Sequence, residues 1–202
     1  MSVSNGSVTV TGLFSLMYGL NPNYLTYAQS NPLKYQTLLT QVLEQQGYKI
    51  DAYTTTNLSQ FSLKPLFFGN INEDNFNYYK RKSPHANDAD MVDKMIADLD
   101  ASEKTQPWFK FIFMTSSHYS YDYPVEFTKF TPTPEIDGAY MLNKNIDATA
   151  FVNDYKNSLY YLDSLFEKIN KSLKANNLYD NTIVVITGDH AEEFNDNNAG
   201  YW

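Results

Sequence analysis

Two nearly continuous apolar runs, over residues 108–114 and 182–187, constrain the fold of this 202-residue chain more than any other feature. Short runs without polar alternation are typical of strands that are covered on both faces, as in parallel sheets. Each run is preceded by a segment with helical periodicity. The two runs therefore predict buried strands that alternate with helices.

Helical spacing predicts three further elements and a short one at the start. Helices are expected over about residues 32–46, from Asp88 or Asp90 to about residue 102, and over about 148–175. A short apolar helix is expected from Gly12, capped by the hydroxyl residues before it. Residues 48–54 predict a strand, and residues 57–87 predict no regular element. The alternation predicts an α/β fold with a mainly parallel central sheet and helices on both faces.

Composition excludes several function classes. The chain has no cysteine, which rules out a disulfide framework and a zinc–thiolate site. Its net charge is −8 and its only arginine is Arg81, so nucleic acid is not expected as a partner. The one basic cluster, Lys80-Arg81-Lys82, is either a solvated loop or a contact for an anionic headgroup. No apolar run is long enough to cross a membrane.

The residues that could carry chemistry follow the two apolar runs. Ligands of parallel α/β sheets bind beyond the carboxyl ends of the strands. His118 lies in the segment after the first run, and Asp189 and His190 follow the second. A carboxylate and an imidazole side by side are suitable ligands for a divalent metal ion. On the pair alone, an alternative is that Asp189 caps a turn and His190 is a hydrogen-bonded loop residue.

Three motifs in order resemble the alkaline phosphatase and sulfatase superfamily. Ile-Thr-Gly-Asp-His-Ala-Glu-Glu-Phe at residues 186–194 is similar to its metal-binding segment. Residues 9–19 have the spacing of its nucleophile helix, which places Thr9 at the nucleophile position. Ser-His-Tyr at residues 117–119, with Pro124 close behind, looks like its substrate-side histidine segment. The resemblance is strongest to membrane-anchored, sulfatase-like proteins of the Gram-negative inner membrane (the YejM/PbgA type).

The resemblance implies a metal-dependent phosphoryl-transfer or phosphoester hydrolase domain. Thr9 would be the nucleophile and would share a divalent ion, Zn, Mn, Mg or Ca, with Asp189 and His190, while His118 would contact the substrate. A threonine cannot form the formylglycine of sulfatases, which favours phosphoryl over sulfuryl transfer. Ser7 is an alternative nucleophile if the alignment shifts by two residues. The implied partners are a lipid headgroup or phosphoester substrate, and a membrane reached through segments outside this chain.

Departures from the family pattern leave a second hypothesis open. Leu13 stands where sulfatases have an arginine, and Ala191 stands where glycine is usual. A non-catalytic sulfatase-like module that binds lipid or a protein partner and regulates envelope lipid homeostasis would tolerate both. In either case residues 1–202 are expected to be a partial periplasmic domain of a bacterial inner-membrane protein, truncated at both ends. The 202 residues by themselves are not expected to be fully active.

Overall fold

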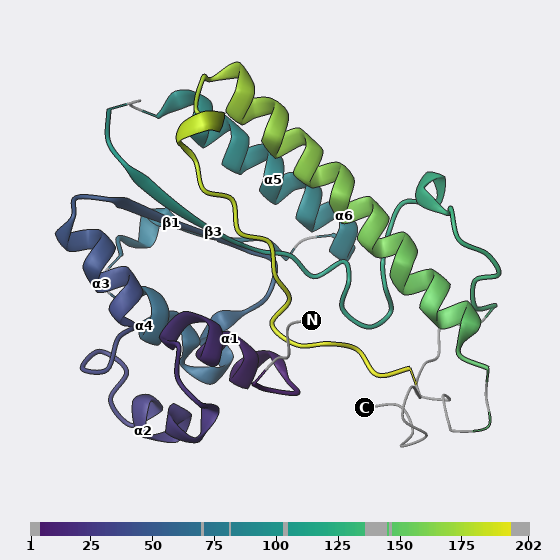
Figure 1. Cartoon of the computed structure of the whole chain (residues 1–202), viewed down its shortest axis with the longest axis horizontal. Coiled ribbons are helices and arrows are strands. Elements are labelled where there is room, and N and C mark those ends of the chain that lie inside the picture. The colour runs from purple at the N-terminus through teal and green to yellow at the C-terminus, as the bar shows by residue number, and fades with distance from the viewer. Residues whose placement is uncertain are drawn as a thin grey trace. The chain divides into compact units, whose positions relative to one another are not determined.

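The computed structural model of the chain describes residues 5–69, 71–80, 82–102, 105–135, 145 and 147–194 (Figure 1). The chain divides into two compact units. Unit 1 comprises residues 1–78, 102–113 and 184–191, and unit 2 comprises residues 79–101, 114–183 and 192–202. Arg81, at the centre of the predicted basic cluster, lies outside the described residues.

Unit 1 is built on a three-stranded parallel sheet in the order β2-β1-β3. The strands are β1 (Lys49–Thr54), β2 (Phe76–Tyr78) and β3 (Trp108–Phe113). β1 and β3 pair along their full lengths. The predicted α/β class, the parallel sheet and the strands at 48–54 and 108–114 are confirmed. β2 was not predicted, because three residues are too few to show a strand period.

Helices of unit 1 cover one face of this sheet. They are α1 (Thr9–Tyr18), α2 (Leu25–Gln29), α3 (Leu38–Gln45) and α4 (Leu63–Phe68). Alternate residues of a strand point to opposite faces. Ile50 and Ala52 of β1 and Phe111 of β3 therefore join one buried apolar core with side chains of α1 and α4. This core packs α1 and α4 against the sheet.

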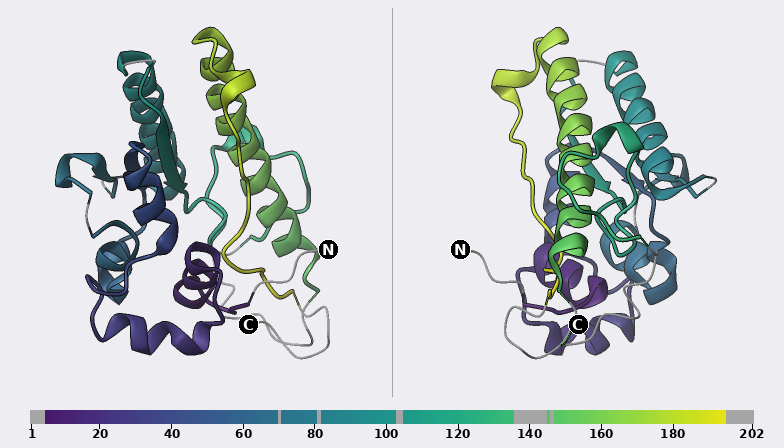
Figure 2. Two further views of the ribbon diagram at one scale, coloured as in Figure 1. Left: turned by 60° about the vertical axis from the view of Figure 1, so that its left-hand side comes forward. Right: turned by 90° about the vertical axis from the view of Figure 1, so that its right-hand side faces the viewer.

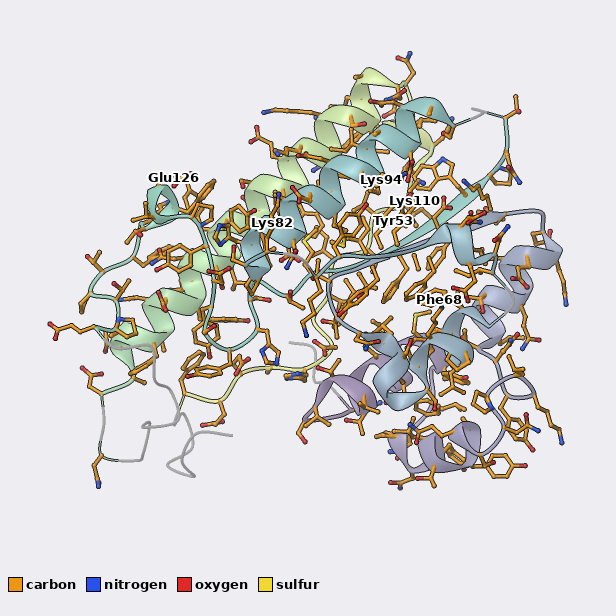
Figure 3. All side chains as sticks on the ribbon, turned by 180° about the vertical axis from the view of Figure 1, so that it is seen from behind. Tyr53, Phe68, Lys82, Lys94, Lys110 and Glu126 are labelled. Carbon is orange, nitrogen blue, oxygen red and sulfur yellow. The ribbon has the colours of Figure 1, made fainter. Side chains whose placement is uncertain are left out.

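The opposite face of the sheet carries a buried ion pair. The Nζ atom of Lys110 in β3 donates to Oδ2 of Asp51 in β1, at 2.9 Å, and lies 3.4 Å from the Tyr53 hydroxyl (Figure 3). The two charged side chains are only 5% and 4% exposed. Asp51 stands directly opposite Lys110 in the register, so the pair links the two strands across the ladder.

Unit 2 contains the two long helices. α5 (Pro84–Ala101) and α6 (Thr149–Ala175) run alongside each other (Figures 1 and 2). The Nζ atom of Lys168 lies 3.2 Å from Asp93, and Asn176 donates to Asp100 at 2.6 Å. α6 begins within one residue of its predicted start, whereas α5 begins four residues before Asp88. Short 3-10 turns complete the chain at Pro22–Tyr24, Leu58–Phe61, Glu73–Asn75, Val125–Phe127 and Tyr179–Asn181.

The structure corrects several predictions, among them that of residues 57–87, which were expected to hold no regular element and contain α4 and β2. Residues 182–187 are extended but form no strand, and Ile183 and Val185 are 92% and 76% exposed. A strand needs a neighbour for its backbone hydrogen bonds, and none pairs with this segment among the described residues. The helix expected from residue 32 begins only at Leu38, where the Thr37 hydroxyl accepts from the Leu39 amide as an N-cap.

Candidate functional site

Thr9 is the first residue of α1, in unit 1. The helix begins three residues before the predicted Gly12. Its N-cap is Val8, which makes no side-chain capping bond, so the predicted hydroxyl cap is wrong. The first N–H groups of a helix have no partner within the helix and favour anionic groups. The N-cap side chain therefore makes no hydrogen bond to the N–H groups at the helix end where Thr9 lies.

The Thr9 hydroxyl faces the imidazole of His190. Oγ1 of Thr9 lies 3.5 Å from Nε2 of His190, across 181 residues of sequence. Nδ1 of His190 lies 3.0 Å from the carbonyl oxygen of Ala191. A carbonyl can only accept, so this contact assigns the proton to Nδ1. Nε2 then carries a lone pair that points toward Thr9.

Asp189 completes this group of side chains in unit 1. Its Oδ2 atom lies 3.6 Å from Nε2 of His190, and both side chains are mostly buried. The backbone carbonyl of Asp189 packs against Gly12 in the first turns of α1, so closely that a Cβ atom at residue 12 would overlap it. This contact holds the segment after residue 188 against the helix that carries Thr9.

The donor set of the Thr9 cluster, which consists of Thr9, Asp189 and His190, fits a divalent metal ion. Two ligands at about 2.1 Å from a tetrahedral ion lie about 3.4 Å from each other. The separations of 3.5 Å and 3.6 Å are close to that value. The described ranges contain no group of three His, Cys, Asp or Glu side chains suited to a metal. A site here would therefore use the threonine hydroxyl as its third donor.

Residues 2–202 match the sequence model of the sulfatase family. The chain belongs to the sulfatase family. It is 26% identical over 195 residues to an uncharacterised protein of Haemophilus influenzae, covering 96% of this chain and 26% of that protein. It is 27% identical over 181 residues to the lipoteichoic acid synthase of Staphylococcus saprophyticus, covering 86% of this chain and 26% of the synthase. The chain thus spans about a quarter of the length of these relatives.

Solved structures of low sequence identity share the fold of this sulfatase-family chain. The C-terminal periplasmic domain of phosphoethanolamine transferase EptC from Campylobacter jejuni gives a TM-score of 0.63 at 21% identity, covering 87% of this chain and 52% of that domain. The lipoteichoic acid synthase LtaP from Listeria monocytogenes gives a TM-score of 0.65 at 17% identity, covering 95% of this chain and 46% of the synthase structure. Both likenesses concern the fold. None of the helices in the described ranges has the length and hydrophobicity of a membrane span.

His118 lies in unit 2, in the segment that follows β3, and its side chain is exposed. Its Nδ1 atom lies 3.2 Å from the carbonyl oxygen of Tyr119, which leaves Nε2 as an acceptor. The structure brings Thr9, Asp189 and His190 together in unit 1. His118 belongs to unit 2, and its substrate-side role stays a prediction.

Asp88 organises the segment that carries His118, and the sequence did not indicate this. Asp88 was expected to cap a helix, but it is a fully buried residue inside α5. Its carboxylate accepts from the amides of Thr115 and Ser116, at 3.1 Å and 2.8 Å, and from the Ser116 hydroxyl. These partners are 27 and 28 residues away, beyond the range of any local sequence pattern.

His85 forms a second set of contacts within unit 2. It lies in the first turn of α5 and is half-buried. Its Nδ1 atom donates to Oδ2 of Asp122 at 2.7 Å, and its carbonyl oxygen accepts from the Tyr161 hydroxyl at 2.7 Å. Burial raises the pKa of Tyr161 well above its usual range, with Asp88 and Asp122 adding to the effect. These contacts join α5, α6 and residue 122 within unit 2.

Proposed function

We propose that the chain carries the nucleophile and two metal ligands of a site for phosphoryl transfer or phosphoester hydrolysis. The observation that supports this is the contact between the Thr9 hydroxyl and His190 Nε2 at the start of α1. A nucleophile, a lone-pair donor and a helix N-terminus meet there. Each of these groups suits chemistry on a phosphate.

The reaction begins with attack of Thr9 Oγ1 on phosphorus. A bond forms between that oxygen and phosphorus as the hydroxyl proton passes to water. The bond from phosphorus to the leaving alkoxide breaks, and the alkoxide takes up a proton from water. The product is a phospho-threonine, which water or an acceptor hydroxyl then resolves. Backbone N–H groups of the first turn of α1 stabilise negative charge on the phosphoryl oxygens.

Thr9, Asp189 and His190 would hold the divalent ion. Such an ion, when bound, lowers the pKa of a coordinated hydroxyl and offsets the charge that develops on the phosphate. The proton on Nδ1 of His190 is held by the Ala191 carbonyl, which keeps Nε2 free of a proton and available as a ligand. Zn, Mn, Mg and Ca are the candidates.

The substrate class follows from the names of the relatives. They include phosphoethanolamine transferases and lipoteichoic acid synthases, and two of the solved structures are a periplasmic domain and a soluble domain. We infer that this chain acts on a lipid-derived phosphoester outside the cytoplasmic membrane, with His118 contacting the substrate. The membrane would be reached through segments outside this chain.

A second function is favoured by Leu13. This residue occupies the position where sulfatases have an arginine, and it is only 1% exposed in the core of unit 1. Leu13 therefore cannot recognise an anion as the guanidinium of an arginine would. A non-catalytic module that binds lipid or a protein partner and regulates envelope lipid homeostasis fits this observation.

Variants of two neighbouring threonines distinguish the two functions. In the full product of the gene, incubated with phospholipid and each candidate metal, we expect mass spectrometry to find a phospho adduct on Thr9. Thr9→Ala lowers turnover by more than about a thousandfold, because it removes the attacking atom. Thr9→Ser retains the hydroxyl and part of the activity.

Thr11→Ala is the matched control, since the Thr11 hydroxyl donates to the Val8 carbonyl in the same turn. It should leave turnover within about threefold of the parent, as a surface change does. An adduct on Ser7 would identify Ser7, in place of Thr9, as the nucleophile. If no adduct forms and Thr9→Ala preserves function in cells, the non-catalytic function holds instead.

A further inference from the structure

Tyr121 lies three residues after His118, and its backbone closes the turn that carries this histidine. The Tyr121 amide donates to the His118 carbonyl at 2.8 Å. Ser120 and Tyr121 both adopt the left-handed backbone conformation, with φ angles of 55° and 46°. That conformation is unfavourable for residues with a Cβ atom and persists only where surrounding contacts hold it. The conformation of the His118 turn therefore depends on what holds Tyr121 in place.

The Tyr121 side chain is buried among aromatic rings of unit 2, and only 5% of the residue is exposed. Its ring contacts Tyr155 of α6 and Phe194, with centroids 5.4 Å and 6.0 Å apart. Tyr155 and Phe194 also contact each other, at 5.6 Å. Aromatic pairs at such separations attract one another beyond the effect of the area that they bury. The three residues are called the Tyr121 cluster below.

A hydrogen bond adds to this packing. The Tyr121 hydroxyl bonds to the Glu192 carboxylate, and burial together with this carboxylate raises the pKa of Tyr121. Glu192 and Phe194 follow His190, one of the proposed metal ligands, by two and four residues. Tyr121 therefore contacts two residues of the segment that continues from the metal ligands.

The chain between His190 and Phe194 is short. Four residues span at most about 14 Å when fully extended. In unit 1 the Asp189 carbonyl packs against Gly12, and in unit 2 Phe194 packs in the Tyr121 cluster. A chain held on both sides of His190 restricts the positions that its imidazole can take.

We propose that Tyr121 is a positioning residue for His118, which it holds in a fixed turn on the segment that follows His190. This inference rests on the proposed function, because it concerns the placement of the substrate-side histidine. Tyr121 acts through His118 and does not contact the substrate, since its ring is buried and its hydroxyl bonds to Glu192. An ordinary core tyrosine would need neither the left-handed backbone nor the contacts to both segments.

Turnover by the full product of the gene tests the proposal, with phosphatidylethanolamine and phosphatidylglycerol in detergent as substrates and each candidate metal. We expect Tyr121→Leu to lower kcat/KM at least about tenfold, because His118 no longer lies where it contacts the substrate. In a His118→Ala background the same change should lower kcat/KM less than about threefold, since residues that act through one another are not additive. Equal losses in the two backgrounds overturn the proposal.

Two further variants control for a general loss of packing. Tyr121→Phe keeps the ring contacts and should retain at least about a third of the turnover of the parent. Phe127→Leu is the matched control, because Phe127 also packs on two rings of α6, those of Tyr160 and Tyr161, at 5.8 Å and 5.1 Å. It should leave kcat/KM within about twofold of the parent. Circular dichroism and thermal unfolding check that each variant is folded. A loss in Phe127→Leu as large as that in Tyr121→Leu overturns the proposal.

Nuclear magnetic resonance of the 202-residue chain separates this proposal from the proposed reaction. The three histidines are isotope-labelled, and zinc, one of the candidate ions, is added. We expect zinc to shift the imidazole signals of His190 and, through the Tyr121 cluster, those of His118. In Tyr121→Leu the shift at His118 should be lost while the shift at His190 remains.

The outcomes of this titration are distinct. Both shifts in a parent protein that shows no turnover contradict the proposed reaction and support the coupling through Tyr121. The absence of a shift at His118 in the parent overturns the proposal. A shift at His118 that persists in His190→Ala also overturns it, because zinc then binds His118 directly. If zinc shifts neither histidine, the proposed metal site and the role of Tyr121 are both wrong.

Discussion

The carbonyl oxygen of Asp189 lies against the Cα atom of Gly12, with no room for a side chain at residue 12. Gly12 is buried inside α1, where glycine is otherwise a poor helix former. The close approach explains why a glycine stands there. It also sets how near Asp189 and His190 come to the helix that begins with Thr9.

Gly12→Ala is therefore expected to displace the Asp189-His190 segment. Alanine in a helix would normally stabilise it by about 1 kcal/mol relative to glycine. Here the added methyl group overlaps the Asp189 carbonyl, so we expect lower stability and at least about a tenfold loss of metal affinity by isothermal titration calorimetry.

Ser15→Ala in the same helix is the control. The Ser15 hydroxyl is buried without a partner among the described residues, so its removal should be neutral or stabilising. Unchanged metal affinity in Gly12→Ala would contradict the positional role of this contact.

Lys110→Met should destabilise the fold by about 3 kcal/mol, because it leaves the Asp51 carboxylate in a buried position without its closest cation. Lys49 at 3.3 Å, from a more exposed position, offsets part of that loss. Urea unfolding measures the change. The double variant Asp51→Leu, Lys110→Met should recover most of the stability, since no buried charge remains. A double variant as unstable as the single one would mean that packing, and not charge, explains the loss.

Asp88→Ala should disorder the segment that carries His118. It removes the acceptor for two backbone amides and a hydroxyl, in a position that is fully buried. We expect a loss of about 2–4 kcal/mol in unfolding free energy, together with faster amide exchange at Thr115 and Ser116. Asp93→Ala on the same helix breaks an exposed pair with Lys168 and should cost less than about 1 kcal/mol. Unchanged exchange at residues 115 and 116 would count against this role of Asp88.

Stability should fall as the pH rises above about 10, the ordinary pKa of tyrosine. Burial raises the pKa of Tyr18 to about 12, from an ordinary value of 10.0. Between these two values the unfolded chain releases the tyrosine proton and the folded chain keeps it, so unfolding becomes more favourable as the pH rises. Burial also raises the pKa of Tyr121 and Tyr161, in the same direction. Urea unfolding at about pH 8, 10 and 11 measures the slope, and Tyr18→Phe should make it shallower. A slope that is identical in Tyr18→Phe would exclude this tyrosine as a source.

Elements with a strong period were predictable, and short ones were not. α6 carries a long amphipathic pattern over 27 residues and was predicted within a residue at its start. β1 and β3 were predicted from their apolar runs. α4 and β2 have six and three residues, which is too short for a period to be evident. The segment 182–187 has a strong apolar pattern, yet it forms no strand because it has no paired neighbour among the described residues.

The candidate site was predictable in its residue types and order, because the family resemblance rests on short motifs. Thr9, Asp189 and His190 were singled out from such motifs. In the structure, Nε2 of His190 lies 3.5 Å from the Thr9 hydroxyl and 3.6 Å from Oδ2 of Asp189, which are the separations expected of ligands of one ion. Their roles stay predictions until metal binding and turnover are measured. The contributions of Asp88 and of the Asp189 carbonyl were not predictable, since both depend on contacts between residues far apart in the chain.

The sequence by itself determined the α/β class, the long helices and the residues at which chemistry is expected, because these depend on local periodicity and short motifs. Only the tertiary structure decided that α1 begins at Thr9, that Gly12 admits the Asp189 carbonyl, and that Leu38 and Val42 face solvent. Burial and close approach depend on which segments meet in space. A local pattern can show that a side chain is apolar, but the packing of the whole chain decides what covers it.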